Sequence, residues 1–97
     1  MMMVLITYDV NVETPAGKKR LRQVARACEN KAQRVQNSVF ECWIENADWI
    51  LMRKKLEDLI DPATDSLRFY FLGKNWEHRV EHVGTKEGYN PQGPLIV

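Results

Sequence analysis

The stretch Val4-Leu-Ile-Thr-Tyr-Asp9 decides the fold, because it opens the chain with a short buried β-strand. Its β-branched and aromatic side chains suit a pleated sheet, and a run of this length favours a strand over a helix. The strand ends at a carboxylate, Asp9. We therefore expect a polar side chain at the exit of an N-terminal strand.

A helix is predicted after the polar stretch Asn11 to Gly17. Its apolar residues recur at i, i+3, i+4 and i+7 and form one stripe, made of Leu21, Val24, Ala25 and Cys28. The cations of the segment fall outside that stripe and form a solvent-facing basic ridge: Lys18, Lys19, Arg22 and Arg26. Arg20 flanks the stripe.

Two short strands are expected over Gln33 to Ile44, with Asn37-Ser38 as the turn, although one bulged strand fits the same residues. A second helix follows, which Asn46 can cap and Asp61-Pro62 stops. Its apolar positions are Trp49, Met52, Leu56, Leu59 and Ile60. Ser66 to Leu72 alternates between apolar and polar side chains, which predicts a half-buried strand.

The order of these elements predicts an α+β protein with the ferredoxin-like βαββαβ arrangement over residues 1–97, as one domain. Right-handed crossovers place both helices on one face of the sheet. The other face carries apolar side chains without a cover, so we expect a homodimer. Val80 to Val83 predicts an extra C-terminal strand, and residues 74–97 form an extension expected to dock on the partner subunit.

Length and composition exclude several classes of protein. A chain of 97 residues has no room for two domains, and 44% hydrophobic residues are too many for a disordered chain. The apolar run Met1 to Ile6 is too short for a signal peptide or a membrane span. Cys28 and Cys42 lack metal-ligand spacing, and we interpret them as reduced core residues of a cytoplasmic protein.

Charge is distributed unevenly, although the net charge is only +1. Residues 15–34 hold seven cations and one anion, whereas residues 41–65 hold seven acids and three bases. This asymmetry indicates an anionic partner on one surface. Arg20, Arg22 and Arg34 are the best phosphate ligands, because a planar guanidinium can grip two oxygens at once. A merely solvated helix face is the alternative.

Asp9 is the candidate for chemistry, with a turn or cap residue as the alternative reading. Mg²⁺ keeps most of its waters and is typically held by one or two carboxylates plus substrate phosphate. A two-fold axis that brings Asp9 from both subunits together would build a site that one chain lacks. Tyr8 and Phe40 could stack on bases or sugars, although aromatic residues in strands more often belong to the core. His78 and His82 are expected to be surface histidines.

Five segments together resemble the CRISPR-associated protein two family, in the form found with type I-C systems: Val4-Leu-Ile-Thr-Tyr-Asp-Val10, Lys19-Arg-Leu-Arg22, Arg34-Val-Gln-Asn-Ser-Val-Phe-Glu41, Val80-Glu-His-Val-Gly84 and Pro94-Leu-Ile-Val97. The resemblance implies a ferredoxin-like homodimer that works with the spacer integrase when invader DNA enters the CRISPR array. It also implies a metal-dependent endonuclease on RNA or duplex DNA, with Mg²⁺ or Mn²⁺. Asp9 then takes the catalytic and metal-binding position, and the nucleic-acid-binding positions are Tyr8, Arg20, Arg22, Arg34 and Phe40.

Two function classes therefore stay open. In one, the protein is an enzyme whose paired Asp9 carboxylates hold the metal that activates water. In the other, the same dimer is a DNA-binding scaffold of the integration complex, and Asp9 takes no part in catalysis. A generic RNA-binding domain ranks last, because the alternating aromatic motif that such sheets use for base stacking is not evident.

Overall fold

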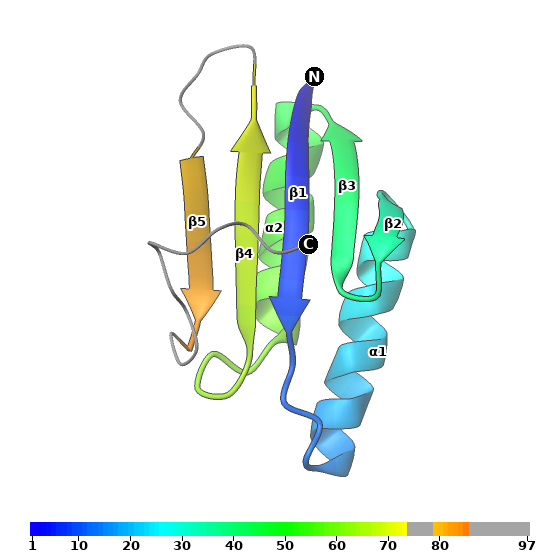
Figure 1. The fold of residues 1–97 in the computed structure, drawn as a ribbon, viewed down its shortest axis with the longest axis vertical. Coiled ribbons are helices and arrows are strands. Elements are labelled where there is room, and N and C mark those ends of the chain that lie inside the picture. The colour runs from blue at the N-terminus through cyan, green and yellow to red at the C-terminus, as the bar shows by residue number, and fades with distance from the viewer. Residues whose placement is uncertain (74–78, 86–97) are drawn as a thin grey trace.

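The protein is described here from a computed structural model, over residues 1–73 and 79–85. Five strands form one sheet in the order β2-β3-β1-β4-β5, and every neighbouring pair is antiparallel (Figure 1). The elements are β1 (Met2–Asp9), α1 (Pro15–Glu29), β2 (Gln33–Gln36), β3 (Val39–Ile44), α2 (Asn46–Leu59), β4 (Ser66–Leu72) and β5 (Arg79–Gly84). The first strand of the chain is therefore the centre of the sheet.

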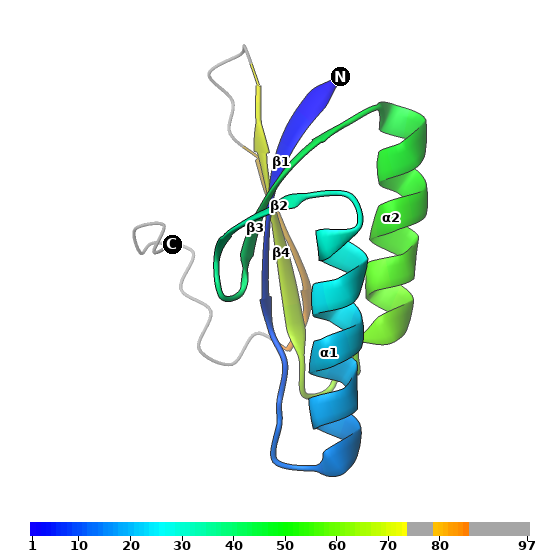
Figure 2. The ribbon, with the colours of Figure 1, turned by 90° about the vertical axis from the view of Figure 1, so that its right-hand side faces the viewer.

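The predicted α+β fold with an added strand is confirmed, and both helices lie on the same face of the sheet (Figure 2). The hairpin interpretation also holds, because β2 and β3 pair across residues 37 and 38. A register shift between Arg34 and Gln36 adds a bulge to it. The added strand, β5, pairs with β4 of the same chain. Of the extension 74–97, which we expect to dock on a partner, residues 74–78 and 86–97 lie outside the described residues, and His78 is among them.

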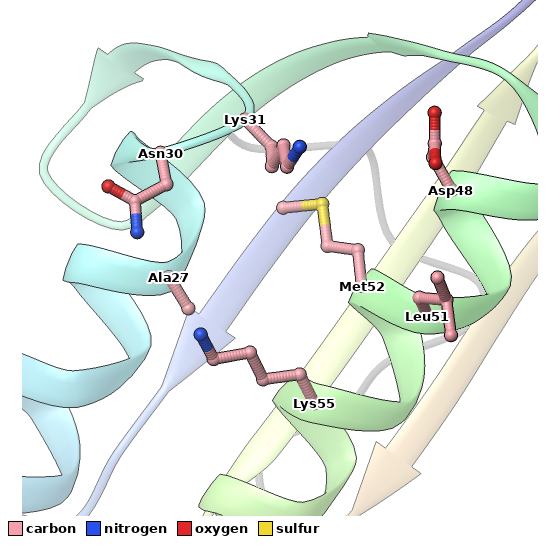
Figure 3. Close-up of a pocket in the computed structure, with 7 residues that line it drawn as sticks. All are labelled: Ala27, Asn30, Lys31, Asp48, Leu51, Met52 and Lys55. Carbon is pink, nitrogen blue, oxygen red and sulfur yellow. The ribbon is translucent and has the colours of Figure 1, made fainter.

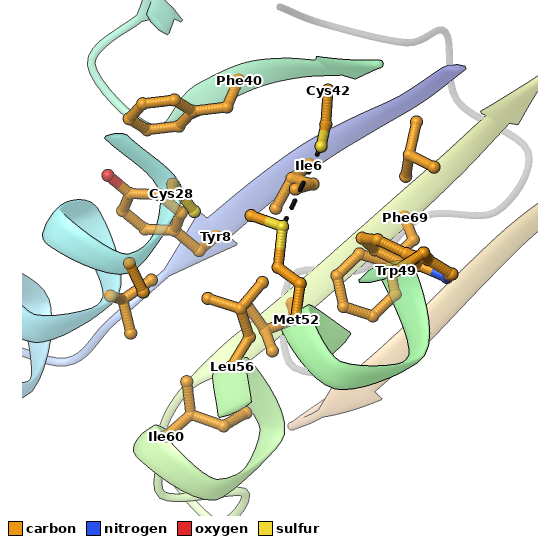
Figure 4. Packing of buried hydrophobic residues seen from close by; sticks show 14 of the residues in the cluster. Ile6, Tyr8, Cys28, Phe40, Cys42, Trp49, Met52, Leu56, Ile60 and Phe69 are labelled. Carbon is orange, nitrogen blue, oxygen red and sulfur yellow. Dashed lines mark hydrogen bonds between the residues drawn. The ribbon is translucent and has the colours of Figure 1, made fainter. Parts of the chain in front are cut away.

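The core fills the space between the sheet and the two helices (Figure 4). Every second residue of the inner strands points into it, among them Ile6, Phe40 and Phe69. The helices contribute Val24, Ala27, Cys28, Trp49, Met52 and Leu56, while Leu21 and Ala25 are only partly buried. The predicted stripes are therefore correct apart from a shift of α1 toward Ala27.

The two helices begin differently. Thr14 caps α1, and its Oγ1 accepts a 3.0 Å hydrogen bond from the backbone N–H of Gly17. The prediction that Asn46 caps α2 is wrong by one residue, since the cap is Glu45, whose side chain makes no capping hydrogen bond. Asp48 in the first turn instead places a negative charge near the positive end of the helix dipole. Neither helix of the described chain is long and apolar enough to cross a membrane.

The face of the sheet opposite the helices has no cover from them (Figure 2). Alternation along the paired strands assigns it Thr7 and Asp9 of β1, Trp43 of β3, and Arg68 and Tyr70 of β4. Trp43 keeps 63% of its surface exposed, so it belongs to this uncovered face rather than to the core. Trp49, in contrast, is a core residue, and its ring meets Phe69 edge-on at 5.0 Å.

Candidate functional site

Asp9 is exposed at the exit of β1, where it lies opposite Ser66 of β4. It contributes to an open hollow of about 230 Å³. The polar side chains around this hollow come from β1, the β2–β3 turn and β4: Thr7, Ser38, Ser66, Arg68 and Tyr70. Arg68 donates a 3.3 Å hydrogen bond from Nη1 to the Tyr70 hydroxyl. One carboxylate therefore shares the hollow with neutral hydroxyls and one guanidinium.

These side chains by themselves do not complete the coordination of a divalent metal ion. Within the described residues, no three His, Cys, Asp or Glu side chains are grouped to hold an ion. Asp9 offers one carboxylate, and the nearby hydroxyl oxygens are weak neutral ligands. Because Mg²⁺ accepts one or two carboxylates together with waters and phosphate, the site fits the ion only if further ligands come from outside the chain.

The rings of Tyr8 and Phe40, both part of the core, form a stack with the guanidinium of Arg34. The Tyr8 and Phe40 rings are 6.1 Å apart at an interplanar angle of 23°, and the Arg34 guanidinium carbon lies 5.0 Å from the Phe40 ring centre. Phe40 is fully buried and Tyr8 nearly so. As placed, neither ring can stack on a base without opening the core.

Both ends of this stack are held by further contacts. The Tyr8 hydroxyl donates to the Asn37 carbonyl oxygen at 3.2 Å, and burial raises the pKa of Tyr8. Arg34 donates from Nη2 to Glu29 Oε1 at 2.7 Å, and 42% of its side chain is exposed. Arg34 is therefore the one member of the stack that a ligand can reach in this conformation.

Arg20 is tied to a buried carboxylate that the sequence analysis did not single out. Its Nε donates a 2.8 Å hydrogen bond to Oδ2 of Asp65, a residue with no exposed surface. The same carboxylate accepts from the backbone N–H groups of Asn11 and Asp61, both at 2.9 Å, and from the Thr64 hydroxyl at 3.1 Å. Burial by itself raises the pKa of Asp65, but these hydrogen bonds, led by that of Arg20, hold it below its ordinary value.

The backbone of Asp65 extends this junction to the end of β5. Its carbonyl oxygen accepts a 3.0 Å hydrogen bond from the Thr85 N–H. Gly84 adopts φ = 102°, and a Cβ there would lie 2.0 Å from that same oxygen, so only glycine fits. Asp65 thus joins the loop after Asp9, helix α1, the loop before β4 and the end of β5. The sequence does not reveal this role of Asp65, because an acidic residue directly before a strand has no distinctive pattern.

The basic ridge of α1 is exposed as predicted. Lys19, Arg22, Gln23 and Arg26 line a shallow hollow of about 280 Å³ on its surface. Among the three arginines chosen as phosphate ligands, Arg20 and Arg34 pair with carboxylates, whereas Arg22 has no such partner within residues 1–73 and 79–85. Arg22 is therefore the arginine that is most available to a phosphate.

The predicted site residues therefore lie in three separate parts of the fold. Asp9 lies at the uncovered sheet face, and Arg22 lies on the outer surface of α1. The others belong to the buried stack or to the Asp65 junction: Tyr8, Phe40, Arg34 and Arg20. Sequence reasoning missed Arg68 and Tyr70 as neighbours of Asp9, although their alternation in β4 placed them on the face opposite the core.

Comparison with known proteins relates the whole chain to one group. A relative from Chlorobaculum tepidum, named CRISPR-associated endoribonuclease Cas2, is 58% identical over 96 residues, 99% of this chain and 100% of that protein. A relative from Halalkalibacterium halodurans, named CRISPR-associated endonuclease Cas2, is 50% identical and covers 98% of this chain and 99% of its own. The crystal structure of Streptococcus pyogenes Cas2 at pH 6.5 superposes with a TM-score of 0.69 at 61% identity, over 77% of this chain and 90% of that one.

The fold and the charge distribution define a small ferredoxin-like protein with a carboxylate at the exit of its central strand and a cationic first helix. The family model for CRISPR associated protein Cas2 matches residues 2–80. The chain belongs to the Cas2 family, and the family inferred from its sequence is confirmed.

Proposed function

We propose that the protein is a metal-dependent endonuclease of CRISPR adaptation that cleaves phosphodiester bonds of double-stranded DNA or RNA. The observation that carries the proposal is the exposed Asp9 carboxylate, which lies at the exit of the central strand in a polar hollow. The names of the relatives, endoribonuclease and endonuclease, support a nuclease role in general.

The proposed enzyme is a homodimer that uses the uncovered face of the sheet. That face exposes the large apolar side chain of Trp43, and an exposed tryptophan on an uncovered sheet face suits contact with a second copy. Asp9 lies on the same face, so two copies related by a two-fold axis can present two carboxylates to one gap. This pairing supplies the second acidic ligand that one chain lacks.

At this gap, Mg²⁺ or Mn²⁺ would supply an activated water and a positive charge for the phosphodiester. Asp9 of each chain would hold the ion. Arg68, hydrogen-bonded to Tyr70 in the same hollow, is suited to neutralising charge on the scissile phosphate. Arg22 and the neighbouring cations of α1 would bind phosphates along the nucleic acid.

The finer features of the proposal rest on the resemblance of the sequence segments to that family. They are the spacer integrase as partner, a cytoplasmic location and the type I-C form of the family. A dimer that binds duplex DNA through α1 could present that DNA to an integrase whether or not Asp9 is catalytic.

The scaffold function is a second candidate because of one specific observation. Asp9 lies on the uncovered face of the sheet, whereas the basic ridge belongs to α1, which covers the opposite face (Figure 2). DNA bound along the ridge would therefore not pass directly over the Asp9 hollow.

Purified protein, rigorously freed of contaminating nucleases, separates the two candidates. The enzyme cleaves DNA or RNA only with a divalent metal, and Asp9→Asn abolishes cleavage while the dimer persists in size-exclusion chromatography with light scattering. Cleavage that is unchanged in the variant would reject the enzyme. A variant that also keeps duplex binding and spacer integration, together with a wild-type protein that shows no cleavage, would establish the scaffold instead.

A further inference from the structure

A third hollow lies between the two helices, on the side of the molecule away from the uncovered sheet face (Figure 3). It has a volume of about 200 Å³ and forms where the end of α1 faces the first half of α2. Neither Asp9 nor the cations of the ridge contribute to it. Because it is on the helix side, it stays accessible when two copies associate through their sheets.

The floor of this hollow is apolar. Ala27 of α1 and Met52 of α2 form it, and behind Met52 the Cys42 thiol lies 3.9 Å from the Met52 sulfur. A methionine floor adapts to side chains of different shape. An engineered apolar cavity of about 150 Å³ admits benzene, so this hollow can take one leucine- or phenylalanine-sized side chain.

The rim of the hollow includes an aliphatic side chain, that of Leu51, which is not part of the core. Leu51 lines the hollow and is 69% exposed. The outer surface of α1, in contrast, is polar and basic. An exposed aliphatic residue next to an apolar hollow is typical of a surface that a partner covers.

Charge at the rim indicates the chemistry of that partner. Lys31, which follows α1, and Lys55 on α2 both point into the space between the helices (Figure 3). Within the described chain neither lysine forms an ion pair, and Asp48 is the one acid that lines the hollow. Two cations against one anion beside an apolar floor favour a ligand that is both acidic and apolar.

We propose that this groove between α1 and α2 is the docking site for an acidic segment of a partner protein, which inserts one large apolar side chain between Ala27 and Met52 and places carboxylates near Lys31 and Lys55. A nucleic acid would satisfy the two lysines but would leave the apolar floor and Leu51 uncovered. The inference is independent of nuclease activity, because the groove shares no side chain with the Asp9 hollow.

The test is an NMR titration of the full chain with a short amphipathic peptide that carries leucine and glutamate side chains. We expect saturable shifts of the Ala27 and Met52 amides. A matched peptide with glutamine in place of glutamate, and another with alanine in place of leucine, should each bind about tenfold more weakly or worse, a loss of about 1.4 kcal/mol. The same loss is expected for the acidic peptide when the protein carries Lys31→Glu together with Lys55→Glu, or Leu51→Ser.

Matched controls lie on the same helix outside the hollow. Ile50 is 67% exposed and Lys54 pairs with Asp58, so Ile50→Ser and Lys54→Gln should leave the affinity unchanged. The proposal is overturned if no peptide gives saturable shifts at the groove, or if the controls weaken binding as much as the groove variants. It is also overturned if duplex DNA produces the groove shifts, or if those shifts depend on protein concentration without peptide, since the occupant is then nucleic acid or a second copy.

Discussion

The Nε of Arg20 donates a 2.8 Å hydrogen bond to a carboxylate oxygen of Asp65, which has no exposed surface. Arg20, which the family resemblance places at a nucleic-acid-binding position, is therefore paired with a buried carboxylate of its own chain. The same carboxylate accepts a hydrogen bond from the backbone N–H of Asn11, which lies two residues after Asp9. Through this contact, Asp65 fixes the path of the chain as it leaves the candidate site.

The first prediction concerns stability. Asp65→Asn weakens the hydrogen bonds that a fully buried carboxylate accepts and should lower the free energy of unfolding by about 1–3 kcal/mol. Arg20→Ala should also lower the free energy of unfolding, because the buried carboxylate loses its charged partner. Since the two residues act through one contact, the double variant should lose less than the sum of the two. Urea denaturation measures all three, and strictly additive losses would show that the pair is not coupled.

The second prediction is a pH dependence. Because the pKa of folded Asp65 lies below its ordinary value, the ionised carboxylate stabilises the fold fully above about pH 4, and this stabilisation is lost as the pH falls through the folded pKa. The difference in unfolding free energy between the wild-type protein and Asp65→Asn should therefore stay constant above about pH 5 and narrow as the pH falls below about 4. A difference that also stays constant below about pH 4 would contradict the assignment.

The third prediction separates binding from stability on α1. Arg22 is exposed and has no carboxylate partner within the described residues. Arg22→Ala should weaken duplex binding across sequences and lower the slope of log affinity against log salt by about 0.9. Thermal stability should not change. Gln23→Ala, in the same shallow hollow but uncharged, is the control, and an equal loss in both variants would mean that Arg22 contacts no phosphate.

The fourth prediction concerns the two thiols. Both are buried, and burial, with the neighbouring Cys42, raises the pKa of Cys28 to about 12. At about pH 8 the thiols of the native protein should therefore react very slowly with an alkylating reagent. Both thiols should react rapidly in the denatured protein, where they are exposed. Mass spectrometry after alkylation counts them. Rapid modification of native Cys28 would indicate that the packing of α1 against the sheet is looser than described.

The fold could be predicted because its signals are local. Alternation in Ser66 to Leu72 and the helical stripe ending at Cys28 depend on neighbours within a few residues, and each led to the correct element. The start of α2 was misplaced by one residue because Asn46 is a better capping residue than Glu45, and capping preference locates a helix end only to within one or two residues.

The site was harder to predict because it depends on contacts between distant residues. The exposed position of Asp9 follows from its place at a strand end. The Arg20–Asp65 pair spans 45 residues and has no periodicity to reveal it. Tyr8 and Phe40 were candidates for stacking on nucleic acid, with a place in the core as the alternative. The register of β1 against β3 and their burial show that both point toward the helices.

The central claim is that one active site is built from two Asp9 residues, one from each copy of the chain. It is tested most directly by mixing equal amounts of wild-type and Asp9→Asn protein, allowing the subunits to exchange, and measuring metal-dependent cleavage. If both carboxylates are required, the activity should fall to about a quarter of that of wild-type protein at the same total concentration. A quarter is the fraction of dimers in which both subunits carry Asp9. Activity of about one half would show that each chain acts alone and would contradict the shared site.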